Sequence, residues 1–373
     1  MHVMMTMENV KMDGVKRAST VLGNALAAES EIDLWYYSLA ETTPFFELDA
    51  PLIVAQPAAD PSLANFFGAD PYAVYRDQIT DLVFQIKRLA IDVVILPAGL
   101  LNSFAPLLKA QCPNVRLIGW MHNNFNTYMN DYYQEMQAEF VAGLKAVDEL
   151  IVLTDADYDE YRRYNEHIVK IYNPLTIDAA QSDLSQPIVA FTGRIAIQHK
   201  GIDLLLRAAP TLTPGWRIAI AGDGAPEDMA RFQALVAELG VADRIIYRGA
   251  LKDDALKRHY QDASVFVSTS RWEGMPLVIG EAMASGLPVV AMSNSGSDEF
   301  LQNGRYGYLT APADVADFSQ HLNLMTRNAS LRQHFSRRSL KRAQDFGIDQ
   351  IVSEWLPLLG VTQWNDNYDA MMG

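Results

Sequence analysis

The sequence predicts an α/β protein built from two Rossmann-like domains that face a central cleft. Three observations lead to this prediction. The length of 373 residues suits two domains of ordinary size. Short apolar runs alternate with helix-like segments along the chain, as in βα units that form parallel sheets. A polar stretch that ends in Pro187 interrupts this series near its middle and reads as a linker.

The first series of elements predicts one complete α/β domain over residues 1–175. Its expected strands are 2–7, 32–38, 52–56, 91–97, 115–121, 149–154 and 168–171. Its expected helices are 16–28, 72–89, 102–111, 130–146 and 156–165.

A second series predicts another such domain over residues 176–345. Its expected strands are 188–192, 217–221, 244–247, 265–268 and 288–291, and its expected helices are 202–209, 227–239, 254–262, 276–284, 297–303 and 314–326. Residues 346–373 read as a C-terminal helix that contains Trp355, followed by a polar tail. We expect this helix to pack back on the first domain.

The charge distribution excludes some partners and favours one half of the chain for binding anions. With 30 basic and 45 acidic residues the net charge is −15, which argues against nucleic acid as a partner. Up to residue 175 there are 12 basic and 23 acidic residues, and beyond it 18 and 22. The nearly balanced second half is therefore the expected anion-binding half.

Cysteine content and hydropathy indicate the compartment. Cys112 is the only cysteine, which excludes an intramolecular disulfide and fits a reducing environment. No secretory signal is evident, and no apolar window is long enough for a membrane-spanning helix. We expect a cytoplasmic protein whose membrane contact, if any, is peripheral at the inner face.

A first chemical motif is FTGRIAIQHKG, residues 191–201. A strand leads to Gly193, Arg194 follows at its carboxyl end, and Lys200 is expected to open the next helix. Ligands bind at this edge of parallel sheets, so two cations beside a helix N-terminus predict a diphosphate site. Two solvated surface cations would explain the segment equally well if it stood alone.

A second motif, STSRWEGMPLVIGEAMASGLPVV, spans residues 268–290. Glu273 lies in the loop and Glu281 within the following helix, at different depths of one expected site. Helix capping and salt bridges are the simpler explanation of isolated carboxylates, but the spacing within a glycine and proline framework favours ligand binding: sugar hydroxyls at Glu273 and a ribose diol at Glu281. The backbone between them is expected to take part in donor binding at Gly274, Met275, Pro276 and Leu277.

Weaker signals lie elsewhere in the chain. Gly222 of the IAGDG segment reads as a turn near the nucleotide. His122 follows a strand and suits hydrogen bonding to a hexose, although a lone histidine is as often structural. Gly14 would allow the backbone before the first helix to approach a phosphate. Asp155 and Asp157 resemble a metal-binding pair, but a helix N-cap with an acidic first turn fits them better.

Taken in order, these segments resemble the family 4 retaining glycosyltransferases, which have the GT-B fold. The resemblance is strongest over residues 187–326, through FTGRIAIQHKGID, IAGDG, the E-x7-E element, ASGLPVVA and NSGSDEFLQNGRYGYL. In the first domain it rests on Gly14 and WMHNN. The chain departs from the family pattern at Asp13-Gly14 and at Ser295-Gly296, where glycine pairs are usual.

The resemblance implies a metal-independent hexosyltransferase that needs no cofactor. It would move a hexosyl group, with retention, from a nucleotide-diphosphate sugar to a carbohydrate or lipid-linked saccharide acceptor in cell-surface polysaccharide or glycoconjugate biosynthesis. A UDP-sugar is the preferred donor. Carried onto this chain, Arg194 and Lys200 would hold the diphosphate, Glu281 the ribose, Glu273 the sugar hydroxyls, and His122 the sugar near its reacting end. A catalytically silent partner protein and a nucleotide-sugar epimerase remain as alternatives.

Overall fold

A computed structural model describes residues 1–63 and 66–361 of the chain. The chain divides into two compact units. The first comprises Met1–Pro174 together with the segment that begins at Gly347, and the second comprises Leu175–Phe346. Each unit is built around its own parallel sheet.

Within the described residues the first unit contains a seven-stranded sheet in the order β3-β2-β1-β4-β5-β6-β7. All of its strand pairs are parallel. The strands are β1 (His2–Met7), β2 (Asp33–Ala40), β3 (Leu52–Ala59), β4 (Val93–Pro97), β5 (Arg116–Trp120), β6 (Glu149–Val152) and β7 (Ile168–Lys170). The order reverses between β1 and β4, which is where ligands bind in open sheets of this kind.

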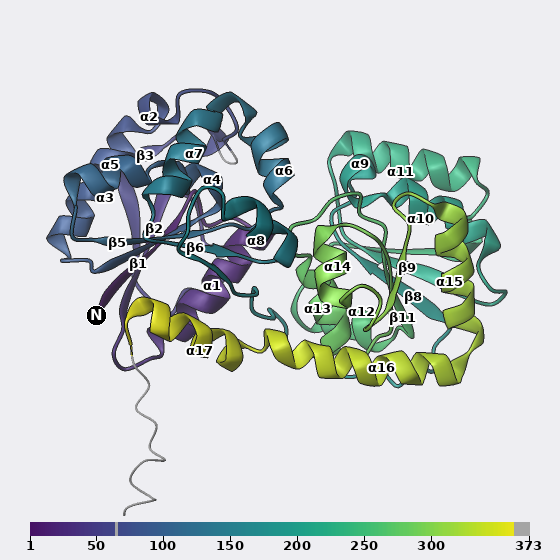
Figure 1. The fold of residues 1–373 in the computed structure, drawn as a ribbon. Helices are drawn as coiled ribbons and strands as arrows, with labels where there is room; N and C mark the ends of the chain where they lie inside the picture. Colours follow the sequence, from purple (N-terminus) through teal and green to yellow (C-terminus); the bar gives the residue numbers. More distant parts are fainter. Residues whose placement is uncertain (64–65, 362–373) are drawn as a thin grey trace, which may run out of the picture. The chain divides into compact units, whose positions relative to one another are not determined.

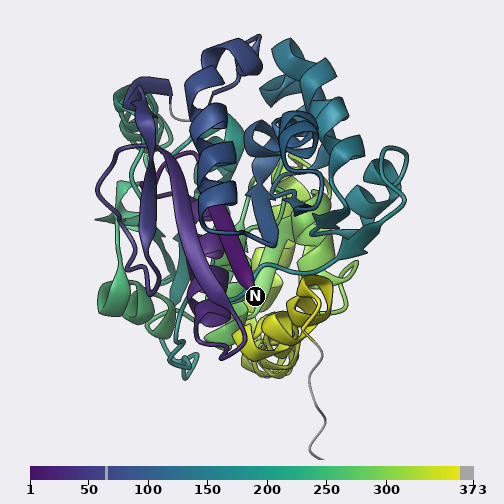
Figure 2. The same ribbon diagram turned by 90° about the vertical axis from the view of Figure 1, so that its left-hand side faces the viewer.

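Helices cover both faces of this sheet (Figures 1 and 2). They are α1 (Gly14–Ala27), α2 (Pro71–Val74), α3 (Arg76–Arg88), α4 (Ala98–Ser103), α5 (Ala105–Gln111), α6 (Phe125–Thr127), α7 (Gln137–Ala146), α8 (Asp155–Tyr161) and α17 (Ile348–Leu359). Short turns of other helix types are η1 (Pro61–Leu63), η2 (Tyr128–Tyr132) and η3 (Gln134–Met136). Strand side chains such as Met4 and Val94 pack against α3, α5 and α7 to form the main core.

The helix α17 packs on α1 in the first unit. Trp355 of α17 is fully buried, and its ring meets that of Trp120 edge-on with the centroids 5.0 Å apart. Trp120 in turn lies against the ring of His122, 4.2 Å away. The C-terminal helix therefore supports the end of β5, from which His122 projects.

The described part of the second unit has a six-stranded sheet in the order β10-β9-β8-β11-β12-β13, again parallel throughout. Its strands are β8 (Ile188–Thr192), β9 (Arg217–Ala221), β10 (Ile245–Gly249), β11 (Val265–Ser268), β12 (Val289–Met292) and β13 (Tyr308–Thr310). Together the two sheets confirm the prediction of two Rossmann-like α/β domains.

The helices of the second unit are shown in Figure 1. They are α9 (Ile197–Lys200), α10 (Ile202–Ala208), α11 (Pro226–Glu238), α12 (Asp253–Gln261), α13 (Leu277–Ala284), α14 (Ser295–Leu301), α15 (Val315–Arg327) and α16 (Ala329–Ala343), with short turns η4 (Ala209–Thr211), η5 (Ala242–Arg244) and η6 (Gln344–Phe346). The main core of the unit is apolar and includes side chains of β8, β9, β11, α10 and α15.

Some expected elements differ in their details. The helix expected over 72–89 is two helices that meet at Tyr75. The helix expected over 102–111 falls on two helices that meet at Phe104: α4, which begins at Ala98, and α5, which ends at Gln111. The first part of the expected helix 130–146 consists of η2 and η3. The elements α9 and β13 were not expected, because four and three residues are too few to produce a periodic pattern.

Two further expectations concern the whole chain. In the ranges 1–63 and 66–361, no helix combines the length and apolar character that a membrane span requires. The tail expected after the C-terminal helix, residues 362–373, lies outside the described residues.

Candidate functional site

The loop after β8 is held against the loop after β9 by backbone hydrogen bonds. Gly193 N–H donates to Ala221 at 2.9 Å, and Ile195 N–H donates to Asp223 at 2.8 Å. A Cβ on Gly222 would lie 1.8 Å from the carbonyl oxygen of Gly193. Gly222, interpreted from the sequence as part of a turn near a nucleotide, must therefore lack a side chain. Its Cα hydrogens leave room for the loop that carries Arg194 to pack against the loop after β9.

Arg194 extends from this loop into solvent. Its side chain is exposed, and it forms no hydrogen bond or ion pair with any residue that the structure describes. A guanidinium in this position at the carboxyl end of β8 is available to an anionic ligand.

Lys200 ends a helix, where the sequence led us to expect that it opens one. It is the last residue of α9, and Gly201 then adopts a left-handed conformation with φ of +61° before α10 begins. The hydroxyl of Thr269 donates to the carbonyl of Lys200 at 3.1 Å. Lys200 is therefore positioned by the loop after β11 and by α9, and the N-terminus of α10 follows it by two residues.

The Lys200 ammonium is paired with Glu273, 2.5 Å from its Oε1 atom. Burial alone would raise the pKa of Glu273, but the ammonium of Lys200 and the adjacent His199 together lower it to about 2. The glutamate side chain is only 9% exposed. The two residues that the sequence assigned to the diphosphate and to the sugar hydroxyls are thus direct neighbours.

His199 was not singled out from the sequence. Its ring stacks on that of Trp272 with the centroids 4.7 Å apart, its Nε2 lies 3.0 Å from the Trp272 carbonyl oxygen, and it is 3.7 Å from Oε2 of Glu273. Lys200 and His199 therefore lie beside different carboxylate oxygens of Glu273, Oε1 and Oε2 respectively. The sequence feature that could have identified His199 is its position directly before Lys200, within the FTGRIAIQHKG motif.

Arg271 fixes the short helix α9 from a distance of about seventy residues in the chain. Its guanidinium donates to the carbonyls of Ile197 and Gln198, both at 3.0 Å, and forms a two-point pair with Asp203 at 3.0 and 2.8 Å. Four donated hydrogen bonds of this kind, two of them charge-assisted, hold α9 in one place. Arg271 and Asp203 are positioning residues that sequence reasoning missed.

The backbone from Gly274 to Leu277 leads into α13, whose N-cap is Pro276. Gly296 of α14 packs against this segment so closely that a Cβ there would lie 2.6 Å from the carbonyl oxygen of Gly274. The hydroxyl of Ser295 donates to the Glu273 carbonyl at 2.9 Å. The Ser295-Gly296 pair thus anchors the Glu273 loop, while Met275 is buried beneath it.

Glu281 lies fully buried within α13. Its Oε1 accepts a hydrogen bond from the hydroxyl of Thr176 at 2.7 Å, and its Oε2 accepts one from the hydroxyl of Tyr260 at 2.7 Å. Both oxygens are thus already bonded to hydroxyl groups.

Substituting Gly201 by Ala should destabilise the second unit and displace Lys200. The added Cβ would lie 2.0 Å from the Thr269 carbonyl oxygen. Gly240 has nearly the same φ, +62°, and no atom lies within 4 Å of a Cβ placed on it, so Gly240→Ala is a matched control for left-handed strain alone. That strain costs about 1–2 kcal/mol, and Gly201→Ala should cost clearly more in urea unfolding. Equal losses in the two variants would contradict the close approach.

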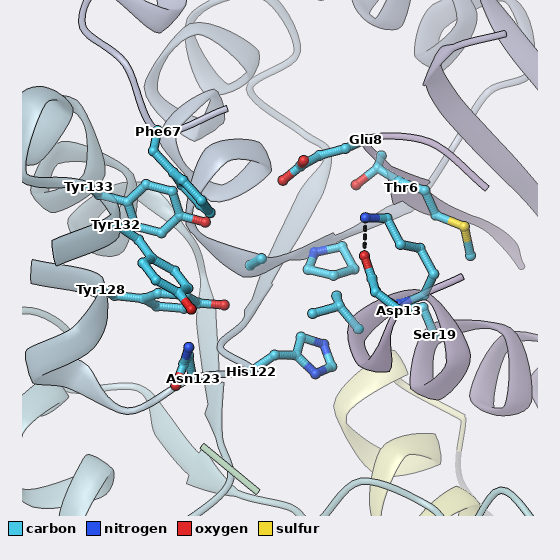
Figure 3. A pocket seen from close by; sticks show the side chains of 15 residues that line it. Thr6, Glu8, Asp13, Ser19, Phe67, His122, Asn123, Tyr128, Tyr132 and Tyr133 are labelled. Carbon is cyan, nitrogen blue, oxygen red and sulfur yellow. Dashed lines mark hydrogen bonds and ion pairs between the residues drawn. The ribbon is translucent and has the colours of Figure 1, made fainter. Parts of the chain in front are cut away.

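In the first unit, a cavity of about 120 Å³ opens where β1, β4 and β5 end (Figure 3). His122 projects into it, with its Nδ1 3.4 Å from the Asn173 amide nitrogen. Its Nε2 is buried and has no partner in the part of the chain that the structure describes. Burial lowers the pKa of His122 to about 3, so the ring is neutral near pH 7 and can exchange hydrogen bonds with a hydroxyl group.

Gly14 begins α1 beside the same cavity, and no atom lies within 4 Å of a Cβ placed on it. The residue before it, Asp13, is the N-cap of α1 and accepts a hydrogen bond from the Lys16 backbone N–H at 2.8 Å. Its other carboxylate oxygen pairs with the Lys16 ammonium.

The interpretation of Asp155 and Asp157 as part of a helix start agrees with the structure. Thr154 is the N-cap of α8, and its hydroxyl oxygen accepts from the Asp157 backbone N–H at 3.1 Å. Asp157 is buried and accepts from the Phe125 N–H at 2.8 Å. Across the described residues, no three His, Cys, Asp or Glu side chains lie close enough together to hold a metal ion.

Two Rossmann-like units, each with a parallel sheet, are the architecture of the GT-B fold, and the solved structures to which the chain is similar share this fold. Residues 186–328 match the family model "Glycosyl transferases group 1". HepE of Anabaena, solved in complex with UDP and glucose, superposes with a TM-score of 0.81 over 96% of this chain and 99% of that one, at 16% identity.

Among curated proteins, an uncharacterized glycosyltransferase of Haemophilus influenzae is 27% identical over 93% of this chain and 96% of its own length. The amylovoran biosynthesis glycosyltransferase AmsD of Erwinia amylovora is 22% identical over 93% of this chain and 95% of its own length. These matches support a GT-B glycosyltransferase of the group 1 type.

Proposed function

We propose that this chain is a retaining, metal-independent hexosyltransferase of family 4 that uses a UDP-sugar. Its acceptor would be a carbohydrate or a lipid-linked saccharide of cell-surface polysaccharide or glycoconjugate biosynthesis. The observation that carries the proposal is the buried Lys200–Glu273 ion pair beside the carboxyl edge of β11, together with the exposed Arg194 at the carboxyl end of β8. HepE binds UDP and glucose and AmsD acts in amylovoran biosynthesis, which supports the donor and the acceptor class.

In this proposal the two cations hold the donor diphosphate and stabilise the charge that develops on it. The bond between the sugar C1 and the β-phosphate oxygen breaks, and negative charge accumulates on that oxygen. Arg194 lies exposed and unpaired by any described residue, while Lys200 is already held in place by Glu273. Because Lys200 is positioned before the reaction, it stabilises the leaving group with little reorganisation.

The remaining residues bind the sugar and the nucleoside. Glu273 would accept hydrogen bonds from sugar hydroxyls, since its pKa of about 2 keeps it ionised at neutral pH. Glu281 would bind the ribose, with the backbone from Gly274 to Leu277 beside the phosphates and Gly193 and Gly222 shaping the loop. His122 and the Gly14 loop of the first unit would bind the transferred sugar. The acceptor oxygen would attack C1 on the face from which the diphosphate leaves, and its proton would pass to the leaving phosphate.

The experiment that tests this function is a screen of nucleotide sugars for turnover by the purified chain, read by mass spectrometry. We expect slow hydrolysis of one UDP-hexose to UDP and free hexose in the absence of an acceptor, because water can replace the acceptor hydroxyl. A silent partner protein would consume none. An epimerase would instead yield an altered nucleotide sugar, which NMR distinguishes from its substrate. We further propose that the protein acts in the cytoplasm, in peripheral contact with the membrane when the acceptor is lipid-linked.

A further inference from the structure

One segment of the second unit has no acidic residue, although the chain as a whole is rich in them. The chain contains 45 Asp and Glu among 373 residues, yet none lies within residues 318–344. The same segment contains six basic residues, at positions 327, 332, 337, 338, 341 and 342. It covers most of α15 and all of α16, which lies at the edge of the second unit (Figure 1). Positive charge is therefore concentrated on one helix of a chain whose net charge is −15.

Two of the six basic residues fasten α16 to its neighbours. The guanidinium of Arg332 donates to two carbonyls in the last turn of α15, at 3.1 and 2.8 Å. Arg342 is buried, donates to two carbonyls of α14 at 3.1 and 2.9 Å, and pairs with Asp345 at 2.6 Å. These two arginines are thus used within the fold, and the helix is held in one orientation.

Three further cations lie together on the exposed side of α16. Arg337, Arg338 and Lys341 are exposed, and with His334 they follow the i, i+3, i+4, i+7 spacing that places side chains on one face of a helix. Arg338 donates to the backbone carbonyl of Arg305 at 2.8 Å, which brings another exposed cationic residue beside the helix. We call Arg305, Arg337, Arg338 and Lys341 the basic face of α16.

The charge of the basic face is not balanced within the chain. Across residues 1–63 and 66–361, none of its four cations forms an ion pair. Arg337 and Lys341 are four positions apart, a spacing at which like charges destabilise a helix. Cations that repel one another and have no counter-ion in the described structure indicate an anionic partner outside it.

The basic face matches a broad anionic surface better than it matches a nucleic acid. The two phenylalanines of α15 and α16, Phe318 and Phe335, are buried, so neither ring can stack on a base. Clusters of at least four Lys and Arg on a helix are typical of contact with anionic lipid headgroups. In about 0.1 M salt charges act over only about 10 Å, so the acidic remainder of the chain does not cancel a contact made by this face.

We propose that the basic face of α16 is a docking surface for an anionic lipid bilayer. The helix lies along the headgroups and its cations bind their phosphates, without insertion into the hydrocarbon. The inference rests on the proposed function in one respect, because a lipid-linked acceptor is what such a contact would serve. The charge and geometry of the face are independent of that activity.

The test is co-sedimentation of the full chain with large unilamellar vesicles. One set contains phosphatidylcholine alone, and the other an equal mixture of phosphatidylcholine and phosphatidylglycerol. The wild-type protein should bind the mixed vesicles at least about tenfold more tightly than the neutral ones, since each cation near an anionic surface contributes about fivefold. Raising the salt from about 0.1 M to about 0.5 M should abolish this binding.

Replacing Arg337, Arg338 and Lys341 together by Gln should weaken binding to the mixed vesicles by roughly a hundredfold. The matched control replaces three other exposed arginines of the second unit by Gln: Arg207, Arg217 and Arg258. These arginines form no ion pair with any described residue, and their loss changes the net charge equally. The control should bind the vesicles as the wild type does. Urea unfolding checks that both triple variants are folded.

Three results would overturn the inference. They are failure of the wild-type protein to prefer the mixed vesicles, equal loss of binding in the two triple variants, and binding that survives high salt. A single-stranded RNA of 20 nucleotides is added as a further probe. RNA binding as tight as vesicle binding, and lost in the same triple variant, would replace the lipid by a nucleic acid.

Turnover of a UDP-sugar in solution separates this inference from the proposed function. The variant of the basic face should hydrolyse the donor as fast as the wild type, because its three positions lie outside the candidate site. Vesicle binding without any turnover would reject the proposed transferase and leave the docking surface standing. Turnover without preference for anionic vesicles would reject the docking surface alone.

Discussion

Replacing Arg194 or Lys200 by Ala is expected to lower kcat/KM for the UDP-sugar by about 100- to 1,000-fold in each case, the range seen when one donor to a developing oxyanion is lost. In the proposed mechanism each cation lies beside the diphosphate, where negative charge develops as this group leaves. The measurement is the initial rate of UDP release. Arg207→Ala is a control, because Arg207 is an exposed cation at the end of α10, in the same unit.

The two variants should differ in stability, which separates structural from chemical effects. Arg194 has no partner among the described residues, so Arg194→Ala should unfold at the same urea concentration as the wild type. Lys200→Ala leaves the buried Glu273 unpaired, and breaking a buried pair costs about 3–5 kcal/mol. Adding Glu273→Gln to Lys200→Ala should restore much of this stability without restoring activity. Near-normal turnover in both single variants would contradict the mechanism.

A second large effect is expected from the protonation of His122. Burial lowers its pKa in the folded protein to about 3, from an ordinary value of 6.5. Above pH 6.5 neither the folded nor the unfolded state binds a proton at this ring. Below pH 6.5 only the unfolded state does, so stability is lost as the pH falls. Between pH 7.5 and 5 the loss from this one group should be about 2 kcal/mol.

His259 of the second unit provides a matched comparison for that measurement. Burial, together with Arg248, lowers its pKa to about 4, so it should contribute in the same pH window. Urea unfolding at pH 7.5 and 5 should show a smaller loss on acidification in His122→Asn than in the wild type. His259→Asn should show a separate reduction of its own. A variant that loses stability on acidification as steeply as the wild type would contradict the neutral, buried state of that ring.

The order of elements could be predicted because buried parallel strands and their covering helices produce strong local patterns. Runs such as 188–192 and 265–268 match β8 and β11 residue for residue. The four-residue helix α9 could not be predicted, since it depends on Arg271 and Thr269, which lie about seventy residues further along the chain. The strand β13 lies at a sheet edge and is only three residues long.

The candidate site was predicted as a set of residues but not as a set of contacts. The pattern of glycines, cations and carboxylates at strand ends pointed to Arg194, Lys200 and Glu273. It did not reveal the ion pair between Lys200 and Glu273, because these two residues lie 73 positions apart in the chain. The sequence predicted Gly222 as a turn near the nucleotide, but not its close packing against the carbonyl of Gly193. The role of His199 depends on neighbours in space, which local patterns do not reveal, whereas the Asp13–Lys16 pair is a local i, i+3 contact in the first turn of α1.

Turnover of a UDP-hexose by the purified chain, with the anomeric configuration of the released hexose followed by NMR, tests the central claim most directly. The account predicts that the wild-type protein releases UDP together with a hexose that first appears in the donor's own anomeric configuration, and that Arg194→Ala does so at least about 100-fold more slowly. Release of the opposite anomer would contradict retention. A folded protein that consumes no nucleotide sugar and binds no UDP would contradict the proposed function as a whole.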